Sequence, residues 1–516
     1  MLLAAVVCLI CVLQHRYSKR RLLPPGPRGL PLVGNILQIP LENQFKTFTE
    51  WGKTYGDLVY ASLFQQPLII VNSVRAAQHL MEKRGAIYSD RPRFLSITDF
   101  RGERFGLRPV TSLLPFGDAW RQQRRWLQDV LQTHNTIHGY RSLQRSGVTK
   151  LVARLTTSPE LFFTHIGGYN GALMLETAYG HPVSSAEDEY MVFADSATAA
   201  VAEIGSIAST LADFVPILKY IPTWMPGAGF KRQALRARDM WAEMTRIPYQ
   251  RICDDMALGK ARPSFTTFMI QQVSRDRNLT DDNNHDISNA ASVMYGGREI
   301  NNRPSSKTLH TLLTLLLALT IYPQVVDKAQ AEIDRVIGTS RLPELADRES
   351  LPYLGCIVQE VLRWNPATPL GIPHRLQEND SYNGYGLPEG SMFITNTWAM
   401  SRDPGLYPDP EVFRPERFEE MDAETASARD PRKYTFGFGR RICPGRYLAD
   451  TSIWLVAANI LATMNIRRAC DSAGREIIPT PSFKSGAVSH VEPFECDIRP
   501  RSQQAMDLIT ERNSEH

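Results

Sequence analysis

The chain has 516 residues, 43% of them hydrophobic and 22% charged, a balance typical of a globular protein with a large core. The length exceeds that of a usual single domain, and the net charge of +4 is too small to indicate nucleic acid as a partner. The seven cysteines are odd in number and scattered, which indicates neither a zinc site nor a disulfide framework and fits a reducing, cytosol-facing setting. They are Cys8, Cys11, Cys253, Cys356, Cys443, Cys470 and Cys496.

Residues 1–22 open with an uncharged apolar run, MLLAAVVCLICVL, which basic residues follow. A helix that spans a bilayer needs roughly 20 apolar residues, so this run is short. Positive charge after the run places the rest of the chain on the cytoplasmic side, whereas a signal peptide normally carries its basic segment first. We therefore expect 1–22 to be a single anchor in the endoplasmic reticulum membrane, with a cleaved signal peptide as the alternative.

Residues 23–34 form a proline-rich stretch, LPPGPRGLPLVG, after the anchor. Clustered prolines resist helix formation and favour stiff, extended chain. This composition suits a hinge that separates a membrane anchor from a folded domain.

Beyond the hinge the pattern is mainly α with a minor β portion. The apolar, β-branched stretch 58–71 predicts a small hairpin. Strand and turn signals return over 366–400, with turns expected at Asn383-Gly384 and Pro388-Glu389-Gly390. Residues 403–442 are rich in Pro, Gly and aromatic residues and are expected to be irregular but packed. Helices are expected over 117–131, 308–337, 353–364 and 444–464.

The most informative stretch surrounds Cys443. Glycines stand four residues before it and two after it, at Gly439 and Gly445, with Arg441 and Phe436 upstream. A thiolate in a glycine-rich loop can be the axial ligand of a haem iron, since glycines let backbone amides approach the sulfur. Arg441 can pair with a haem propionate, and Phe436 can pack beside the haem. The alternative is a buried structural cysteine near a turn.

This stretch resembles the haem-binding loop of the cytochrome P450 monooxygenases, whose pattern F-x-x-G-x-R-x-C-x-G is met at every fixed position. The resemblance implies the cytochrome P450 haem-thiolate fold over residues 35–500, followed by a polar C-terminal tail, 501–516. It also implies haem b as the cofactor, with its iron bound by the Cys443 thiolate.

A second set of motif residues follows the same family order. Glu360 and Arg363 share one face of a predicted helix. A Glu-x-x-Arg pair alone is common on protein surfaces. Here Arg417 follows in Phe413-Arg-Pro-Glu-Arg417, and the order resembles the buried lock of the family. The resemblance implies that Glu360, Arg363 and Arg417 hold the cysteine loop, since buried charges require such pairing.

Further cofactor-binding residues are expected upstream. Trp120 and Arg124 are four residues apart on a predicted helix, and both side chains can donate hydrogen bonds to a carboxylate. The resemblance implies that they contact haem propionates, and His374 matches a further propionate-binding position. The alternative for the pair is a half-exposed basic helix.

The chain departs from the family at the oxygen-activation motif, (A/G)-G-x-(D/E)-T. The sequence reads Gly296-Gly-Arg-Glu299-Ile300, so the acid is present and isoleucine replaces threonine. Counting back from Tyr322-Pro323 instead places the expected positions near Thr308. The catalytic candidates for proton delivery are therefore Glu299 and Thr308.

Three explanations of segment 298–307 stay open. One is a misread exon boundary. Another is a real polar bulge, beside Pro304, that places Ser305, Ser306 or Thr308 over the haem. The third is altered oxygen chemistry or loss of activity.

No P-loop or dinucleotide fingerprint accompanies these motifs, so electrons are expected from a separate NADPH–cytochrome P450 reductase. Four arginines could present a positive face to such an acidic partner, or they are simply solvated charges. They are Arg121, Arg125, Arg440 and Arg446.

The leading interpretation is a haem-thiolate monooxygenase that inserts one atom of O2 into an apolar small organic substrate. Segments such as DFVPILKYIPTWMPGAGF, residues 213–230, resemble fungal members that tailor secondary metabolites, in the group that contains O-methylsterigmatocystin oxidoreductase. Two alternatives are a non-redox isomerase or dehydratase of the same fold and a haem-binding protein without catalysis.

Overall fold

The computed structural model describes residues 22–92, 110–132, 134–183, 188–204, 220–276, 279–295, 307–484, 486 and 488–514. The predicted anchor therefore lies outside the described residues, except for Leu22. The chain divides into two compact units. The first comprises Met1–Pro92, Leu370–Met400 and Phe438–Arg440, and the second comprises Arg93–Pro369, Ser401–Gly437 and Arg441–His516.

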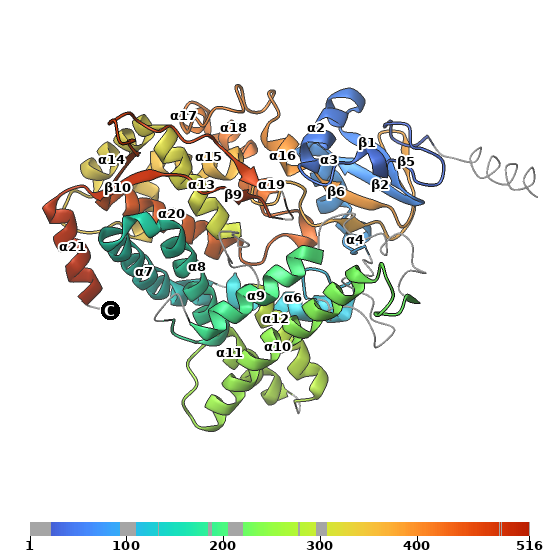
Figure 1. The fold of residues 1–516 in the computed structure, drawn as a ribbon, viewed down its shortest axis with the longest axis horizontal. Coiled ribbons are helices and arrows are strands. Elements are labelled where there is room, and N and C mark those ends of the chain that lie inside the picture. Colours follow the sequence, from blue (N-terminus) through green and yellow to red (C-terminus); the bar gives the residue numbers. More distant parts are fainter. Residues whose placement is uncertain are drawn as a thin grey trace, which may run out of the picture. The chain divides into compact units, whose positions relative to one another are not determined.

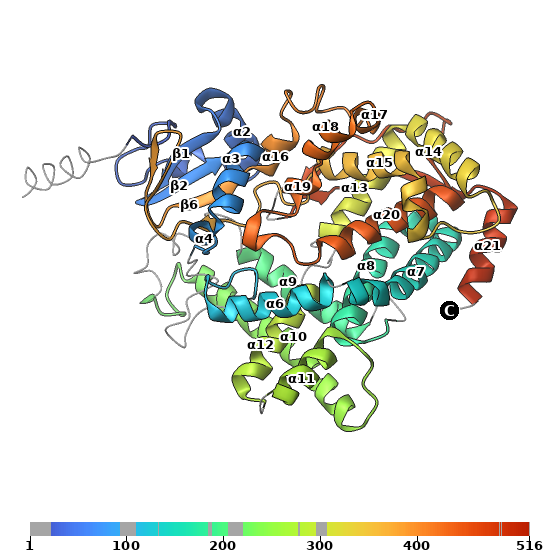
Figure 2. The ribbon, with the colours of Figure 1, turned by 180° about the vertical axis from the view of Figure 1, so that it is seen from behind.

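The first unit is built on a four-stranded sheet in the order β1-β2-β6-β3. β1 (Leu58–Leu63) and β2 (Gln66–Val71) form the predicted antiparallel hairpin. β2 runs parallel to β6 (Met392–Thr395), which pairs antiparallel with β3 (His374–Arg375). Figure 2 shows β1, β2 and β6 as neighbours, with α2 (Gln44–Tyr55) beside them. The last four residues of β2 are buried, as expected of its apolar, β-branched sequence.

The proline-rich hinge packs along β1, and it turns at residues 31–33, where Leu32 adopts a φ of 68°. The N–H of Tyr60 donates to the carbonyl oxygen of Pro25 at 3.0 Å, and the N–H of Asn35 donates to that of Ser62 at 2.7 Å. Gly26 permits this approach, since a Cβ there would lie 1.8 Å from the carbonyl oxygen of Tyr60. The hinge is thus packed on the first unit.

A second hairpin of this unit confirms the predicted turn at Asn383-Gly384. The two residues have φ of 49° and 82°, which few residues other than Asn and Gly adopt readily. They join β4 (Asp380–Tyr382) to β5 (Tyr385–Leu387). The remaining elements of the unit are η1 (Ile36–Gln38), α3 (Val74–Ala77), η2 (Gln78–Lys83), α4 (Gly85–Tyr88) and α16 (Thr397–Ser401), whose last residue belongs to the second unit.

The second unit is mainly helical and buries two large apolar clusters. The larger cluster joins five helices, α7 (His134–Thr157), α8 (Phe162–Tyr179), α13 (Lys307–Ile321), α15 (Pro352–Trp364) and α20 (Arg446–Thr463). Figures 1 and 2 both show α13 beside α15 and α20. The other cluster gathers around α6 (Asp118–Leu131) and α8. Residues of α6 and α20 are packed into these clusters, which hold both helices in place.

The helical pattern predicted over 308–337 is two helices rather than one. α13 ends at Ile321, and α14 (Pro323–Val336) starts at an angle of 103° to it. Pro323 fits the first turn of a new helix but not the interior of a continuing one. No helix in the described part of the chain is by itself long and apolar enough to cross a membrane; α13 and α14 meet that criterion only as a bent pair.

The remaining elements of the second unit confirm a mainly α fold with a minor β portion. Residues 501–516, predicted as a polar tail, contain a helix that buries Ala505 and Ile509. The elements not yet given are η3 (Pro159–Leu161), α9 (Glu189–Ile204), α10 (Gly229–Ala257), α11 (Phe265–Asp276), α12 (Asp281–Tyr295), η6 (Leu345–Ser350), α17 (Glu416–Glu419), α18 (Ala423–Ala428), α19 (Arg432–Thr435), β7 (Met464–Arg468), β8 (Phe483–Lys484), β9 (His490–Val491), β10 (Cys496–Pro500) and α21 (Gln503–Ser514), together with η7 (Gly439–Arg441), which straddles the boundary between the units.

Candidate active site

Cys443 lies in a closed loop just before α20. Its N–H donates to the carbonyl oxygen of Phe436 at 2.8 Å, which brings the two ends of the loop together. Gly437 adopts φ of 82°, a conformation that a side chain would disfavour. α20 begins at Arg446 after Gly445, which makes no side-chain cap. The N-terminus of α20, the positive end of the helix dipole, therefore lies near the sulfur.

Gly439 is required by a close approach within the first unit. It adopts φ of 53°, and a Cβ there would lie 2.0 Å from the carbonyl oxygen of Met81. Gly439, which the sequence pattern singled out for its place near Cys443, is therefore also needed for packing against Met81.

Trp120 and Arg124 lie on the buried face of α6, as the spacing predicted, and Arg441 joins them. The exposed fractions of the three side chains are 6%, 7% and 9%. The guanidinium of Arg441 lies 4.3 Å from the centre of the Trp120 ring, a cation–π contact, and it donates to the carbonyl oxygen of Leu114 at 2.7 Å. These residues form one aromatic and basic cluster within the second unit.

Arg124 is a buried cation without an anionic partner among the described residues. Its Nε is buried and makes no hydrogen bond there. Burial lowers the pKa of Arg124 to about 10, an effect that the nearby Cys443 side chain partly offsets, so the guanidinium stays charged at neutral pH. A buried charge is tolerated only when paired, and a carboxylate is its natural partner. The residues therefore fit a cofactor that brings carboxylates, as haem does with its propionates.

His374 lies in the first unit, on β3. Its backbone pairs with Phe393 of β6, and its Nδ1 lies 2.7 Å from the carbonyl oxygen of Tyr88. The side chain is 7% exposed, so its ring is held in a fixed orientation. Its contact with a propionate stays a prediction.

Glu360, Arg363 and Arg417 form the predicted ion-pair network, and all three are buried, with at most 1% of each side chain exposed. Arg363 grips Glu360 with two hydrogen bonds of 2.7 Å, and Arg417 Nε donates to the same carboxylate at 3.0 Å. Burial would lower the pKa of Arg363, but the Glu360 carboxylate outweighs it and raises that pKa. Burial lowers the pKa of Arg417, partly offset by Glu360. We call these three residues the lock.

The lock fastens the irregular segment that leads to the cysteine loop. Arg363 donates to the carbonyl oxygens of Ser401 and Pro410 at 3.0 and 2.8 Å. Its guanidinium also lies 5.5 Å from the ring centre of Tyr407. The hydroxyl of Tyr434 donates to that of Tyr407 at 3.2 Å, two residues before the loop begins. The lock therefore reaches the loop through two buried tyrosines.

The oxygen-activation candidates are only partly within the described residues. Glu299, Ile300 and Pro304 lie outside them. Thr308 is half-buried in the first turn of α13, the helix at the centre of the larger core cluster. Its catalytic role stays a prediction.

Two glutamines that the sequence motifs did not single out contact the chain just after Cys443. Gln132 Nε2 donates to the carbonyl oxygen of Pro444 at 3.0 Å. Gln144 Nε2 lies 3.2 Å from the carbonyl oxygen of Leu448 and 2.8 Å from the hydroxyl of Ser452. Glutamine is common on helices, so its type and position carried no signal that could have identified these contacts. We call Gln132 and Gln144 the clamp.

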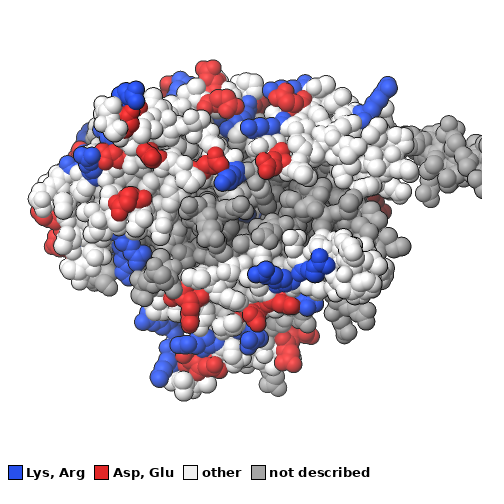
Figure 3. Space-filling view, viewed as in Figure 1, with Lys and Arg blue, Asp and Glu red and all other residues white. Residues whose placement is uncertain are grey.

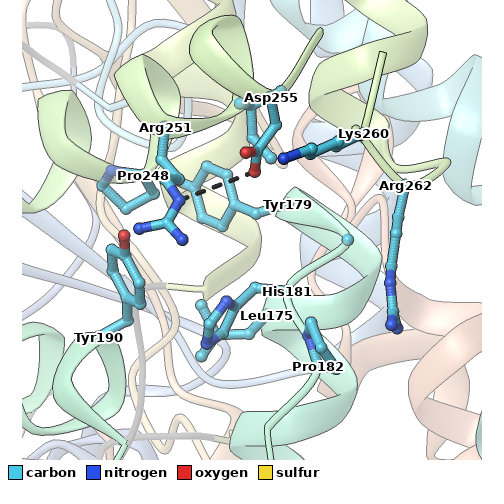
Figure 4. Close-up of a pocket in the computed structure, with 12 residues that line it drawn as sticks. Leu175, Tyr179, His181, Pro182, Tyr190, Pro248, Arg251, Asp255, Lys260 and Arg262 are labelled. Carbon is cyan, nitrogen blue, oxygen red and sulfur yellow. Dashed lines mark ion pairs between the residues drawn. The ribbon is translucent and has the colours of Figure 1, made fainter. Parts of the chain in front are cut away.

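A separate cavity of about 260 Å³ lies between the C-terminal ends of α8 and α10 (Figure 4). Arg251 and Asp255 of α10 form a loose ion pair of 3.8 Å beside it, and Lys260 and Arg262 stand at its rim. These cations offset Asp255 and the partial negative charge of two helix C-termini. None of the predicted site residues lines this cavity.

The predicted partner-binding arginines are on the surface, but their neighbours differ. Arg121 pairs with Asp118 at 2.5 Å, and Arg446 stacks on the ring of Tyr447 at 4.4 Å. Arg125 is exposed on α6, while Arg440 belongs to the first unit. On the face shown in Figure 3, basic and acidic side chains are interspersed over the described surface.

Known proteins with similar sequences share one family name. A family profile described as "Cytochrome P450" matches residues 24–488. Cytochrome P450 monooxygenase 176 of Postia placenta is 54% identical over 496 residues, which cover 96% of this chain and 94% of that protein. Cytochrome P450 monooxygenase 136 of the same fungus is 42% identical, with 97% and 93% covered. Cytochrome P450 monooxygenase claR of Ampulloclitocybe clavipes is 37% identical, with 96% and 90% covered.

Proposed function

The chain belongs to the cytochrome P450 family, a monooxygenase family that uses haem with a cysteine thiolate as axial ligand, and we propose that Cys443 supplies that thiolate for the oxidation of an apolar small molecule. In this reaction one oxygen atom of O2 enters a C–H bond of the substrate. The other atom leaves as water, with two electrons and two protons consumed. The haem supplies the bond chemistry, and the chain supplies the ligand, the pocket and the protons.

The observation that carries the proposal is the cluster of Arg124, Trp120 and Arg441 in the same unit as the Cys443 loop. Arg124 is a buried, charged guanidinium whose Nε has no partner among the described residues. Arg124 and Arg441 would hold the propionates of the haem, and Cys443 its iron. Among the described residues no three His, Cys, Asp or Glu side chains gather to hold a metal ion, and a haem iron at Cys443 would need only the one cysteine ligand from the chain.

Electrons would come from a separate NADPH–cytochrome P450 reductase. Arg125 on α6 and Arg446 at the start of α20 are basic and close in sequence to Arg124 and Cys443. Charge-reversal variants of these two residues should slow reduction by the reductase and weaken its dependence on ionic strength. Unchanged reduction rates would assign the docking surface to other residues.

We place the protein on the endoplasmic reticulum membrane, anchored through residues 1–22 with the remainder in the cytoplasm. Support comes from the apolar run and the basic residues that follow it. Tyr220 and Trp224 are also 73% and 77% exposed, which suits a surface that dips into the lipid interface. Deleting 1–22 should release much of the protein from microsomes, and full retention would point to that second surface.

Proton delivery is assigned to Thr308 and Glu299. Thr308, on α13, carries a hydroxyl group, which can relay a proton. The side chain of Ile300 has no hydroxyl and cannot do so. Thr308→Ala should raise the NADPH consumed per product formed, with peroxide released. Unchanged coupling would assign the relay to another group.

The proposal is tested with labelled oxygen. Full-length protein, reductase and NADPH are incubated under ¹⁸O2 with a panel of apolar aromatic and terpenoid hydrocarbons, a choice that reflects the proposed role in fungal secondary metabolism. A product that gains a single labelled oxygen, only when NADPH and reductase are present, supports monooxygenation. Product that forms without NADPH instead supports the isomerase or dehydratase alternative, which the altered motif at Glu299-Ile300 favours.

A further inference from the structure

The chain that follows Cys443 is held by the clamp. Gln132 is the residue at which α6 ends, on the same helix as Trp120 and Arg124. Its side-chain amide donates to the carbonyl oxygen of Pro444, at 3.0 Å. A proline has no N–H, so the carbonyl is the only backbone group through which residue 444 can be held. One hydrogen bond therefore joins the propionate-binding helix to the residue that directly follows the sulfur ligand.

Gln144 holds the next turn. The residue is 1% exposed on α7, and its Nε2 lies within hydrogen-bond distance of three acceptors on α20. These are the carbonyl oxygen of Leu448 at 3.2 Å, the hydroxyl of Thr451 at 2.9 Å and that of Ser452 at 2.8 Å. The amide has two N–H groups, so it can donate to two of these three acceptors at a time, and these bonds from a buried side chain restrict the rotation and the position of that turn.

Other contacts also hold the first turns of α20, among them the ion pair of Asp450 with Arg348 at 2.7 Å and the burial of Leu448 in an apolar cluster. Gly445 offers no side-chain cap, and the N–H of Arg446 makes only a long bond of 3.4 Å to the carbonyl oxygen of Cys443. The clamp adds direct hydrogen bonds to Pro444 and to this end of α20, and it thereby helps to set the direction of the helix N-terminus and its dipole. That direction decides how strongly the backbone amides stabilise negative charge on the sulfur.

We propose that Gln132 and Gln144 are positioning residues for the haem thiolate, which they hold in place through Pro444 and the first turns of α20. This inference rests on Cys443 being the haem ligand. Both side chains are neutral, so they can fix the loop without adding charge beside the sulfur. An ionised side chain at either place would shift the potential of the iron as well as the position of the loop.

The test measures the ligand rather than turnover. In the reduced carbon-monoxide complex, thiolate ligation gives a red-shifted band that disappears as the thiolate is lost. We expect Gln132→Glu, which keeps the shape but loses the donor, to speed this loss about fivefold to tenfold, and Gln132→Leu to speed it about fivefold. Gln132→Lys, which keeps a donor, should recover most of the wild-type rate. The midpoint potential of the haem should shift in Gln132→Glu but not in the matched control Gln128→Glu, an exposed residue one turn earlier on α6.

Gln144→Leu provides a second, independent variant, with the same expected loss of the red-shifted band. The proposal is overturned if Gln132→Glu and Gln144→Leu both lose the band within about twofold of the wild-type rate. It is also overturned if Gln128→Glu shifts the potential as much as Gln132→Glu. Cys443→Ser tests the premise that Cys443 is the haem ligand separately from the role of the clamp. If that variant retains the red-shifted band, the ligand assignment itself is wrong.

Discussion

The lock holds the chain that precedes Cys443 and the clamp holds the chain that follows it, and the two use different chemistry. The lock, upstream, consists of three charged side chains with at most 1% exposure and reaches the loop through Tyr407 and Tyr434. The clamp consists of two neutral amides that donate directly to Pro444 and to the first turns of α20, just after Cys443. Charge buried this deeply is stable only as a complete set, whereas neutral hydrogen bonds can be lost one at a time. The lock should therefore fail as a whole and the clamp by degrees.

The largest effect is expected from breaking the lock. Glu360→Ala or Arg363→Ala leaves a buried charge unpaired and should destabilise the fold by about 3–5 kcal/mol. Haem content after purification is the measurement, and it should be close to zero in both variants. The control is Arg475→Ala, which removes an exposed arginine paired with Asp471 at 2.8 Å. Wild-type haem content in both lock variants would show that the network has no role in holding the cofactor.

Arg124 is the counter-example within the same unit, a buried cation whose Nε has no partner in the described part of the chain. Arg124→Leu should stabilise the apoprotein, because the unpaired charge is removed, by about 1–3 kcal/mol. The same variant should bind haem more weakly. Chemical unfolding of the apoprotein and haem transfer to apomyoglobin measure the two effects. Changes of the same sign in both would contradict the assignment of Arg124 to a propionate.

His310 offers a buried group that avoids charge altogether. It is fully buried on α13, and burial lowers its pKa to about 3, partly offset by the hydrogen bond with the Asn365 carbonyl oxygen and reinforced by His490. In the unfolded chain His310 has a pKa near 6.5 and binds a proton more readily than in the fold. The free energy of unfolding is therefore not reduced by His310 above about pH 6.5, and it falls as the pH drops toward 3. Below about pH 5.5 the loss should be about 1.4 kcal/mol per pH unit, and His310→Leu should remove it. Urea unfolding from pH 7 to 5 measures this slope, and a variant with the wild-type slope would contradict the account.

The smallest effect on stability is expected from the clamp. Gln144→Leu removes one neutral donor, and the hydroxyl of Thr451 retains its own bond of 2.8 Å to the carbonyl oxygen of Tyr447. The free energy of unfolding should fall by about 1–2 kcal/mol, well below the change in the lock variants. Urea unfolding of the holoenzyme measures it. A loss as large as that of Glu360→Ala would erase the distinction between the two clusters.

The sequence could predict the lock and not the clamp for a physical reason. Buried charges need partners of opposite sign, so Glu360, Arg363 and Arg417 stand in a fixed order that a motif records. A glutamine amide can serve any nearby carbonyl, so neither its type nor its spacing marks a contact across the fold. The family profile and relatives confirm the predicted cytochrome P450 fold and haem-thiolate cofactor. Both predictions rested on motifs in which residue type and spacing are fixed.

Local signals explain the other successes and failures. Asn383-Gly384 predicted its turn because positive φ is readily adopted by those residue types. The pattern over 308–337 concealed the bend before Pro323, because both helices keep apolar residues at helical spacing. The polar composition of 501–516 likewise gave no indication of α21, whose burial rests on Ala505 and Ile509 alone.

The central claim is that Cys443 is the thiolate ligand that both clusters serve. The most direct measurement is the absorption spectrum of the reduced carbon-monoxide complex of Cys443→Ser, compared with wild type. The claim predicts that the red-shifted band of thiolate ligation is absent from the variant, while Cys470→Ser, an exposed cysteine outside the loop, retains it. An unchanged red-shifted band in Cys443→Ser would contradict the assignment and leave the lock and the clamp without the ligand they are argued to position.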